Sequence, residues 1–218
     1  MGYTVIRKDF TTGPQKCDLC SRPLASFKAY IMQDISTGEI IFAGPKCALK
    51  NLHKGQSLSG VPDLTTFTTT LNTRPGGTSK STLHGNIGSE NVVDQEKQRA
   101  LEYLMLREEK LSKVLNCSYH VLAQLYQKYR NGGLSPDDIN HINNIEAKAP
   151  EGLALSRLKE IYNALFWIDV AIPKIPKDKT TFLINVRESI IKHKNITDRQ
   201  KEGINGWLDK IHGVVRLK

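Results

Sequence analysis

The sequence predicts a mainly α-helical protein with a small N-terminal zinc-binding α+β module, treble-clef-like or ribbon-like, and a C-terminal helical bundle. Two observations lead to this fold class. Three cysteines near the N-terminus have a spacing typical of metal ligands, and apolar residues recur at helical spacing from residue 94 onward. We therefore predict a zinc-binding β-hairpin and helix module over residues 1–56, a flexible linker over residues 57–93 and a helical domain over residues 94–218.

The cysteines define the first module. Cys17 and Cys20 form a Cys-x-x-Cys turn, and Cys47 follows in the string Gly-Pro-Lys-Cys. Soft thiolates on a tight turn, joined by a ligand from a second element, favour zinc. Two alternatives are three reduced cysteines buried as small apolar side chains, and a redox disulfide between Cys17 and Cys20. The disulfide is disfavoured because no βαβ pattern surrounds the pair.

A structural zinc ion normally has four ligands, so a fourth must be found. His53 is the nearest candidate in the sequence. On a regular helix, however, Lys50 and Asn51 share the face of Cys47, and His53 does not. His53 is therefore predicted as a ligand on the condition that the helix ends early or bends. A distant histidine or a water molecule is the alternative.

The residues between the cysteines predict a β-hairpin and a short helix. Apolar and polar residues alternate around Tyr30 and Met32, a Ser-Thr-Gly turn lies within residues 34–39, and a second apolar run covers residues 40–42. Pro45 marks the first turn of a helix that we expect to run through Leu52 and to stop at Gly55.

The stretch from Gly55 to about Val93 is rich in Ser, Thr, Gly, Pro and Asn. It carries too little apolar surface to offset the entropy of ordering it, so we predict a linker. A short strand around Phe67 and residues 68–70 is the one element expected within it.

Beyond the linker the pattern predicts helices throughout, over residues 94–115, 119–129, 136–145, 151–170, 182–192 and 198–212. Ser135 before Pro136 is typical of a helix N-cap. Thr197 and Gln200 have the spacing of a capping box. Cys117 and Trp167 are expected in the core.

Two segments resemble known elements. Residues 16–52 resemble a zinc-finger-like element at the front of many uncharacterised bacteriophage and mobile-element proteins. The positions that match are Cys17, Cys20, Gly38, Gly44, Cys47, Ala48 and Leu52, whereas Ser21 replaces the usual glycine. Residues 182–211 resemble a helical hairpin common near the ends of phage and plasmid proteins, and Ile196, Thr197 and Gln200 match it. The resemblance of residues 16–52 implies zinc and a nucleic-acid neighbourhood but no reaction, and the resemblance of the hairpin implies no function.

Charge is concentrated at the two ends of the chain. The net charge is +9, and residues 1–56 carry eight Lys and Arg against four Asp and Glu, residues 57–170 twelve against thirteen, and residues 171–218 eleven against five. Basic ends attract polyanions. We therefore predict binding of DNA or RNA by Lys28, Lys46 and Lys50 near the metal and by Arg187, Lys192, Lys194, Arg199 and Lys201 in the last hairpin.

The predicted function is that of a zinc-binding, nucleic-acid-associated accessory protein of a phage or mobile element. The alternative is an adaptor or inhibitor that docks on a host protein such as RNA polymerase or a replication factor. An enzyme is not expected, because the sequence has no Gly-rich phosphate loop, Gly-x-Ser-x-Gly motif or His-x-x-x-His pair; a nuclease-like activity is the least favoured reading. No apolar run has membrane-spanning length and no secretory signal is visible, so we expect a cytoplasmic protein.

Overall fold

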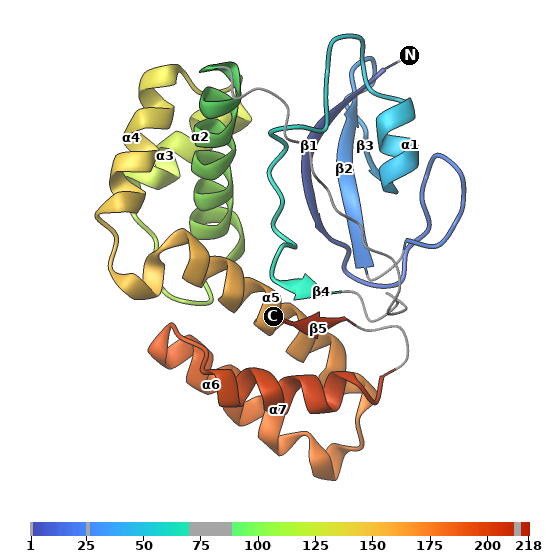
Figure 1. Cartoon of the computed structure of the whole chain (residues 1–218), viewed down its shortest axis with the longest axis vertical. Coiled ribbons are helices and arrows are strands. Elements are labelled where there is room, and N and C mark those ends of the chain that lie inside the picture. The colour runs from blue at the N-terminus through green and yellow to red at the C-terminus, as the bar shows by residue number, and fades with distance from the viewer. Residues whose placement is uncertain (1, 25–26, 70–88, 212–214) are drawn as a thin grey trace.

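The computed structural model describes residues 2–24, 27–69, 89–211 and 215–218. It combines a three-stranded antiparallel sheet near the N-terminus with a largely helical remainder (Figure 1). The short helix α1 (Pro45–Lys50) lies beside the sheet on the side away from helices α2 (Ser89–Leu104) and α3 (His120–Arg130). Among the described residues, none of the helices has both the length and the apolar character needed to cross a bilayer.

The predicted β-hairpin is confirmed. Strands β2 (Lys28–Asp34) and β3 (Ile40–Ala43) pair antiparallel across the predicted turn. The carboxylate of Asp34 accepts hydrogen bonds from the backbone N–H groups of Ser36 and Thr37, and Gly38 has a φ of 75°, which favours glycine. Strand β1 (Tyr3–Phe10), which pairs with the other side of β2, was not predicted.

A β-bulge at Ile6 changes which face of the sheet the residues of β1 occupy. Before the bulge Val5 pairs with Met32, and after it Arg7 pairs with Ile31. Between these two pairs, β1 therefore contains one residue more than β2. Side chains alternate between the two faces of a strand, so an inserted residue moves every following side chain to the other face. The bulge thereby turns Arg7 and Asp9 toward the helices.

Helix α1 begins at Pro45 as predicted but ends at Lys50, before the predicted end near Gly55. Its C-cap is Asn51, and Leu52 then forms a parallel β-bridge with Tyr3. The chain leaves the helix because its backbone pairs with β1: the Tyr3 N–H donates to the Asn51 carbonyl, and the His53 N–H donates to the Tyr3 carbonyl.

The prediction of a flexible linker is wrong for residues 57–69, which pack against the rest of the fold. Leu64 is fully buried, its carbonyl accepts a hydrogen bond from the Asn163 side chain, and the N–H of Lys8 donates to the Pro62 carbonyl. The expected short strand is present as β4 (Thr68–Thr69), which pairs with β5 (Arg216–Leu217) near the C-terminus. Residues 70–88 of the predicted linker lie outside the described residues, and helix α2 begins at Ser89.

The helical part follows the predicted pattern with shifted ends. After α3 come α4 (Pro136–Ala147), α5 (Leu155–Ala171), α6 (Thr181–His193) and α7 (Asp198–Leu208), with short 3₁₀ turns at Glu151–Leu153, Ile172–Lys174 and Lys177–Lys179. Both predicted caps are confirmed: Ser135 with Asp138, and Thr197 with Gln200, form reciprocal capping boxes. Helix α7 ends at Leu208 instead of residue 212, and the Asn205 side chain in its last turn pairs with the backbone of Leu217 in β5.

The helix predicted over residues 94–115 does not continue as an α-helix. After α2 the chain forms a π-helix at Met105–Lys110, and the Leu111 N–H donates to the Leu106 carbonyl five residues back. The wider turn accompanies a buried Arg107, whose guanidinium donates to the Tyr103 hydroxyl and to the Cys117 carbonyl. The π-helix also carries Glu109 and Lys110, which contact β1.

One large core joins the sheet to the helices. The Phe10 ring at the end of β1 stacks on Phe166 of α5 at 4.1 Å and meets the edge of the buried Trp167. Cys117 and Trp167 lie in this core as predicted. A second, smaller cluster lies on the other side of the sheet, between the strands, α1 and the cysteine turn. The N-terminal module therefore packs against the helical part through a shared apolar interior.

Candidate metal centre

The structure brings the three N-terminal cysteines together. One ligand atom from each of Cys17, Cys20 and Cys47 lies within 4.8 Å of the other two. Cys17 is buried, Cys47 is half-buried and Cys20 is exposed. Three thiol groups at this spacing can bind a metal ion that prefers sulfur ligands.

The Cys-x-x-Cys turn has a backbone that directs both thiols to one side. The N–H groups of Cys20 and Ser21 donate to the Cys17 carbonyl, and the Cys17 N–H donates to the Arg22 carbonyl. Ser21 has a φ of 57°, in the left-handed region. A residue with a side chain adopts this region at some conformational cost, and the turn nevertheless forms with serine at this position.

The turn is fastened to the hairpin by a residue between its two cysteines. The Asp18 N–H donates to the Phe42 carbonyl, and the Phe42 N–H donates to the Asp18 carboxylate at 2.7 Å. The Gly44 N–H points at the Cys17 sulfur from 3.5 Å. Cys47 follows in the first turn of α1, so the Cys-x-x-Cys turn delivers two of the sulfur atoms and the start of the helix delivers the third.

The thiols influence one another's ionisation. Burial acts to raise the pKa of Cys17, but hydrogen bonds from the Gly44 and Leu19 N–H groups and from the other two thiols outweigh it, and the pKa is lowered. The pKa of Cys47 is raised to about 11, chiefly by its hydrogen bond with Cys20 and by burial. Cys17 is thus arranged to lose its proton before Cys47, and a bound divalent cation would favour the thiolate form of its ligands.

His53 is not part of this cluster, so the predicted fourth ligand is corrected. Within the described residues, the group of close metal-ligand atoms consists of the three cysteines and does not include His53. The His53 side chain is exposed, and its backbone is held at β1 by the hydrogen bond to Tyr3. The early end of α1 does not bring His53 back to the sulfur atoms, because the chain turns toward β1 instead.

Several residues predicted to contact nucleic acid are engaged within the fold. Lys28 is half-buried and donates to the Thr65 carbonyl, Arg187 pairs with Asp169 at 2.8 Å, and Lys201 pairs with Glu160 at 3.1 Å. The Lys201 ammonium also lies over the Phe67 ring. Lys28 and Lys201 are consequently poor candidates for phosphate contacts.

Four of the other five predicted basic residues are exposed. Lys46, Lys50, Lys192 and Arg199 are exposed, and Lys194 is half-buried at the left-handed C-cap of α6. Among the described residues, no carboxylate lies within 4.0 Å of the charged groups of these five.

Sequence reasoning missed a second cluster, where β1 meets the helices. Asp9 is fully buried, and its carboxylate pairs with Arg7 at 2.9 Å and Lys110 at 2.8 Å and accepts from the Tyr162 hydroxyl at 2.7 Å. Glu109 pairs with Arg7 and accepts from the Tyr126 hydroxyl. The signal that the sequence offers for β1 is the run of aromatic and β-branched residues Tyr-Thr-Val-Ile at positions 3–6, which favours a strand.

Comparisons of the chain with known protein families, with curated proteins and with solved structures found no match.

Proposed function

We propose that the three cysteines bind one zinc ion and that this ion has a structural role in a treble-clef-like module. Thiolates of Cys17, Cys20 and Cys47 would supply three ligands, and a water molecule or a histidine brought from elsewhere would supply the fourth. Zinc is preferred to calcium or magnesium because sulfur is a soft ligand. The proposal is supported by the convergence of a Cys-x-x-Cys turn, a hairpin and the first turn of a helix on one group of sulfur atoms.

We further propose that the protein is a nucleic-acid-associated accessory protein of a phage or mobile element. The observation that carries this is the surface around the cysteines, where Lys16, Arg22, Lys46 and Lys50 are all exposed. Within the described residues none of them lies within 4.0 Å of a carboxylate. Exposed cations without a carboxylate partner among the described residues suit phosphate contacts that are independent of sequence. We call these four residues the basic knuckle surface.

A second basic surface lies on the last helical hairpin. Lys192 and Arg199 are exposed where α6 passes into α7, and Lys194 stands between them. Figure 1 shows α6 and α7 at the lower end of the molecule and α1 in its upper half, so the two surfaces are separate. A nucleic acid that contacts both would follow the long axis of the protein.

The test is a binding titration with fluorescently labelled DNA and RNA at increasing salt. Charge reversal at Lys46 and Lys50 should weaken binding by about tenfold or more and reduce the salt slope by about 2. Charge reversal at Lys97 and Lys148 is the matched control, because these exposed lysines lie on α2 and just after α4 and the net charge changes equally. Equal loss in the two double variants would contradict the proposed surface.

One observation favours docking on a host protein as the second candidate function. Leu49 is 62% exposed on α1 between Lys46 and Lys50, which is unusual for a large apolar side chain. Leu49→Ser should leave nucleic-acid binding unchanged if phosphate contacts dominate. A host polymerase or replication factor that stays bound in high salt and is lost with Leu49→Ser would favour the docking function.

A further inference from the structure

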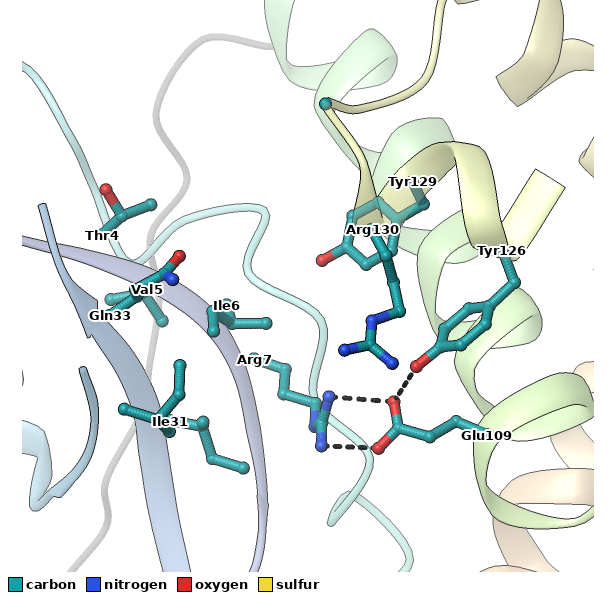
Figure 2. Close-up of a pocket in the computed structure, with 12 residues that line it drawn as sticks. Thr4, Val5, Ile6, Arg7, Ile31, Gln33, Glu109, Tyr126, Tyr129 and Arg130 are labelled. Atoms are coloured by element: carbon teal, nitrogen blue, oxygen red, sulfur yellow. Dashed lines mark hydrogen bonds and ion pairs between the residues drawn. The ribbon is translucent and has the colours of Figure 1, made fainter. Parts of the chain in front are cut away.

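A cleft of about 750 Å³ lies between the sheet and helix α3 (Figure 2). Its sheet wall includes Ile6 and Ile31, and its helix wall includes Tyr126, Tyr129 and Arg130. The volume falls within the range of small-ligand sites.

The sheet wall is mainly apolar. Ile6 stands at the β-bulge, Ile31 follows on the central strand, and Ile40 at the start of β3 is 44% exposed. Thr4 and Gln33 border the same wall. The three isoleucine side chains, of which Ile40 is exposed, give the cleft an apolar floor that an apolar group can contact.

The helix wall carries one cation without a partner. The Glu109 carboxylate is neutralised by Arg7 and Lys110 and is held by the Tyr126 hydroxyl. In the part of the chain that the structure describes, no carboxylate lies within 4.0 Å of the Arg130 guanidinium. Figure 2 shows Arg130 extending from α3 toward the Arg7–Glu109 pair, with no dashed line to its own guanidinium.

We propose that this cleft binds an unpaired nucleotide of single-stranded nucleic acid, with the base against the Tyr129 ring and the isoleucine floor and the phosphate on Arg130. The inference rests on the proposed nucleic-acid function and names the form of nucleic acid that the protein takes. An aromatic ring and a guanidinium beside an apolar wall are the groups that bind unstacked bases and their phosphates.

Hydrogen bonds and ring contacts hold side chains of the cleft wall in place without a ligand. The Tyr126 and Tyr129 rings lie 6.4 Å apart, and the hydrogen bond from Tyr126 to Glu109 holds the first of them. The bulge in β1 and the π-helix in the helical part both border the cleft, and such irregular turns are frequent at functional sites. A duplex would not enter, because its bases are stacked and paired.

The test uses the full chain and a short labelled oligothymidylate or oligouridylate, with a duplex of equal length as the comparison. Arg130→Ala and Tyr129→Leu should each weaken single-strand binding by about tenfold and change duplex binding little. Lys128→Ala is the matched control, because it removes one charge from the same helix outside the cleft; its ammonium pairs with Asp138. Quenching of a 2-aminopurine placed within the strand should be strong with the unaltered protein and lost with Tyr129→Leu.

The outcomes separate this inference from the proposed function. If the Lys46 and Lys50 reversals weaken binding while Arg130→Ala behaves like Lys128→Ala, the cleft proposal is overturned and the basic knuckle surface stands. If Arg130→Ala abolishes single-strand binding while the Lys46 and Lys50 reversals leave it unchanged, the cleft proposal is supported and the role proposed for the basic knuckle surface is overturned. If the unaltered protein binds neither strand nor duplex, both are overturned.

Discussion

Arg7 and Glu109 form two parallel hydrogen bonds, at 3.0 and 2.7 Å, across 102 residues of sequence. Each side chain reaches the pair through an irregular element. The β-bulge at Ile6 turns Arg7 to the helix side of the sheet, and the π-helix carries Glu109 toward β1. With Asp9 and Lys110, the pair joins the N-terminal sheet to the helical part by ionic contacts as well as by the shared core.

Removing the buried carboxylate of Asp9 should destabilise the protein strongly. Asp9→Ala would leave Arg7 and Lys110 with one fewer counter-ion in a buried setting and the Tyr162 hydroxyl without its acceptor. We expect a loss of about 3–5 kcal/mol in the free energy of unfolding, measured by urea denaturation. The control is Asp169→Ala, which breaks a half-exposed pair with Arg187 and should cost less than about 1 kcal/mol. Similar losses in both variants would refute the role given to Asp9.

The Glu109 pair should make stability fall in acid. Burial acts to raise the pKa of Glu109, but Lys110 and Arg7 outweigh it and hold the pKa below its ordinary 4.5. Because the folded state binds the proton less well than the unfolded state, the stabilisation is complete above pH 4.5 and is lost as the pH falls through the lower, folded pKa. Glu109→Gln should flatten this acid decline in the free energy of unfolding, and an unchanged decline would exclude Glu109 as its source.

Lys28 should titrate well below an ordinary lysine. Burial, together with the charge of Lys8, lowers its pKa from 10.5 to about 8 although Asp63 opposes the shift. For a base with a depressed folded pKa, the folded state favours the neutral amine, so stability should rise as the pH increases from about 8 to 10.5. A carbon-detected NMR titration of the Lys28 side chain should show its midpoint near pH 8. A midpoint near 10.5 would mean that the amine is solvated.

Two glycines on α7 should respond differently to alanine. A Cβ on Gly206 would meet no atom within 4 Å, so Gly206→Ala should stabilise the helix by about 0.5–1 kcal/mol. A Cβ on Gly203 would lie 2.4 Å from the tip of the Phe182 ring, so the ring must move and the gain should be smaller or reversed. Thermal unfolding of the two variants compares them directly, and equal gains would show that α6 and α7 do not pack as described.

Local signals in the sequence were enough to predict much of the fold. The turn around Gly38, the proline start of α1 and the caps at Ser135 and Thr197 depend on a few neighbouring residues, and all are present. The cysteine cluster was also predictable, because the spacing of metal ligands is a local property of a turn and a helix start.

The features that sequence reasoning missed depend on distant partners. Residues 57–69 contain few apolar side chains, yet Leu64 is buried because Asn163 and β1 supply hydrogen bonds to its segment. The side to which Asp9 points depends on a single extra residue in β1, which no alternation pattern reveals. His53 was chosen for its nearness in sequence, whereas its position is set by backbone pairing with Tyr3.

The most direct test of the central claim is the zinc content of the purified full chain, measured by elemental analysis beside three single variants. We predict one zinc ion per chain, retained in His53→Ala and lost in Cys17→Ser and Cys47→Ser, with a lower unfolding temperature in the two cysteine variants. An unaltered protein that carries no zinc and has all of its cysteines reactive as free thiols would contradict the metal centre, as would full zinc retention in Cys47→Ser.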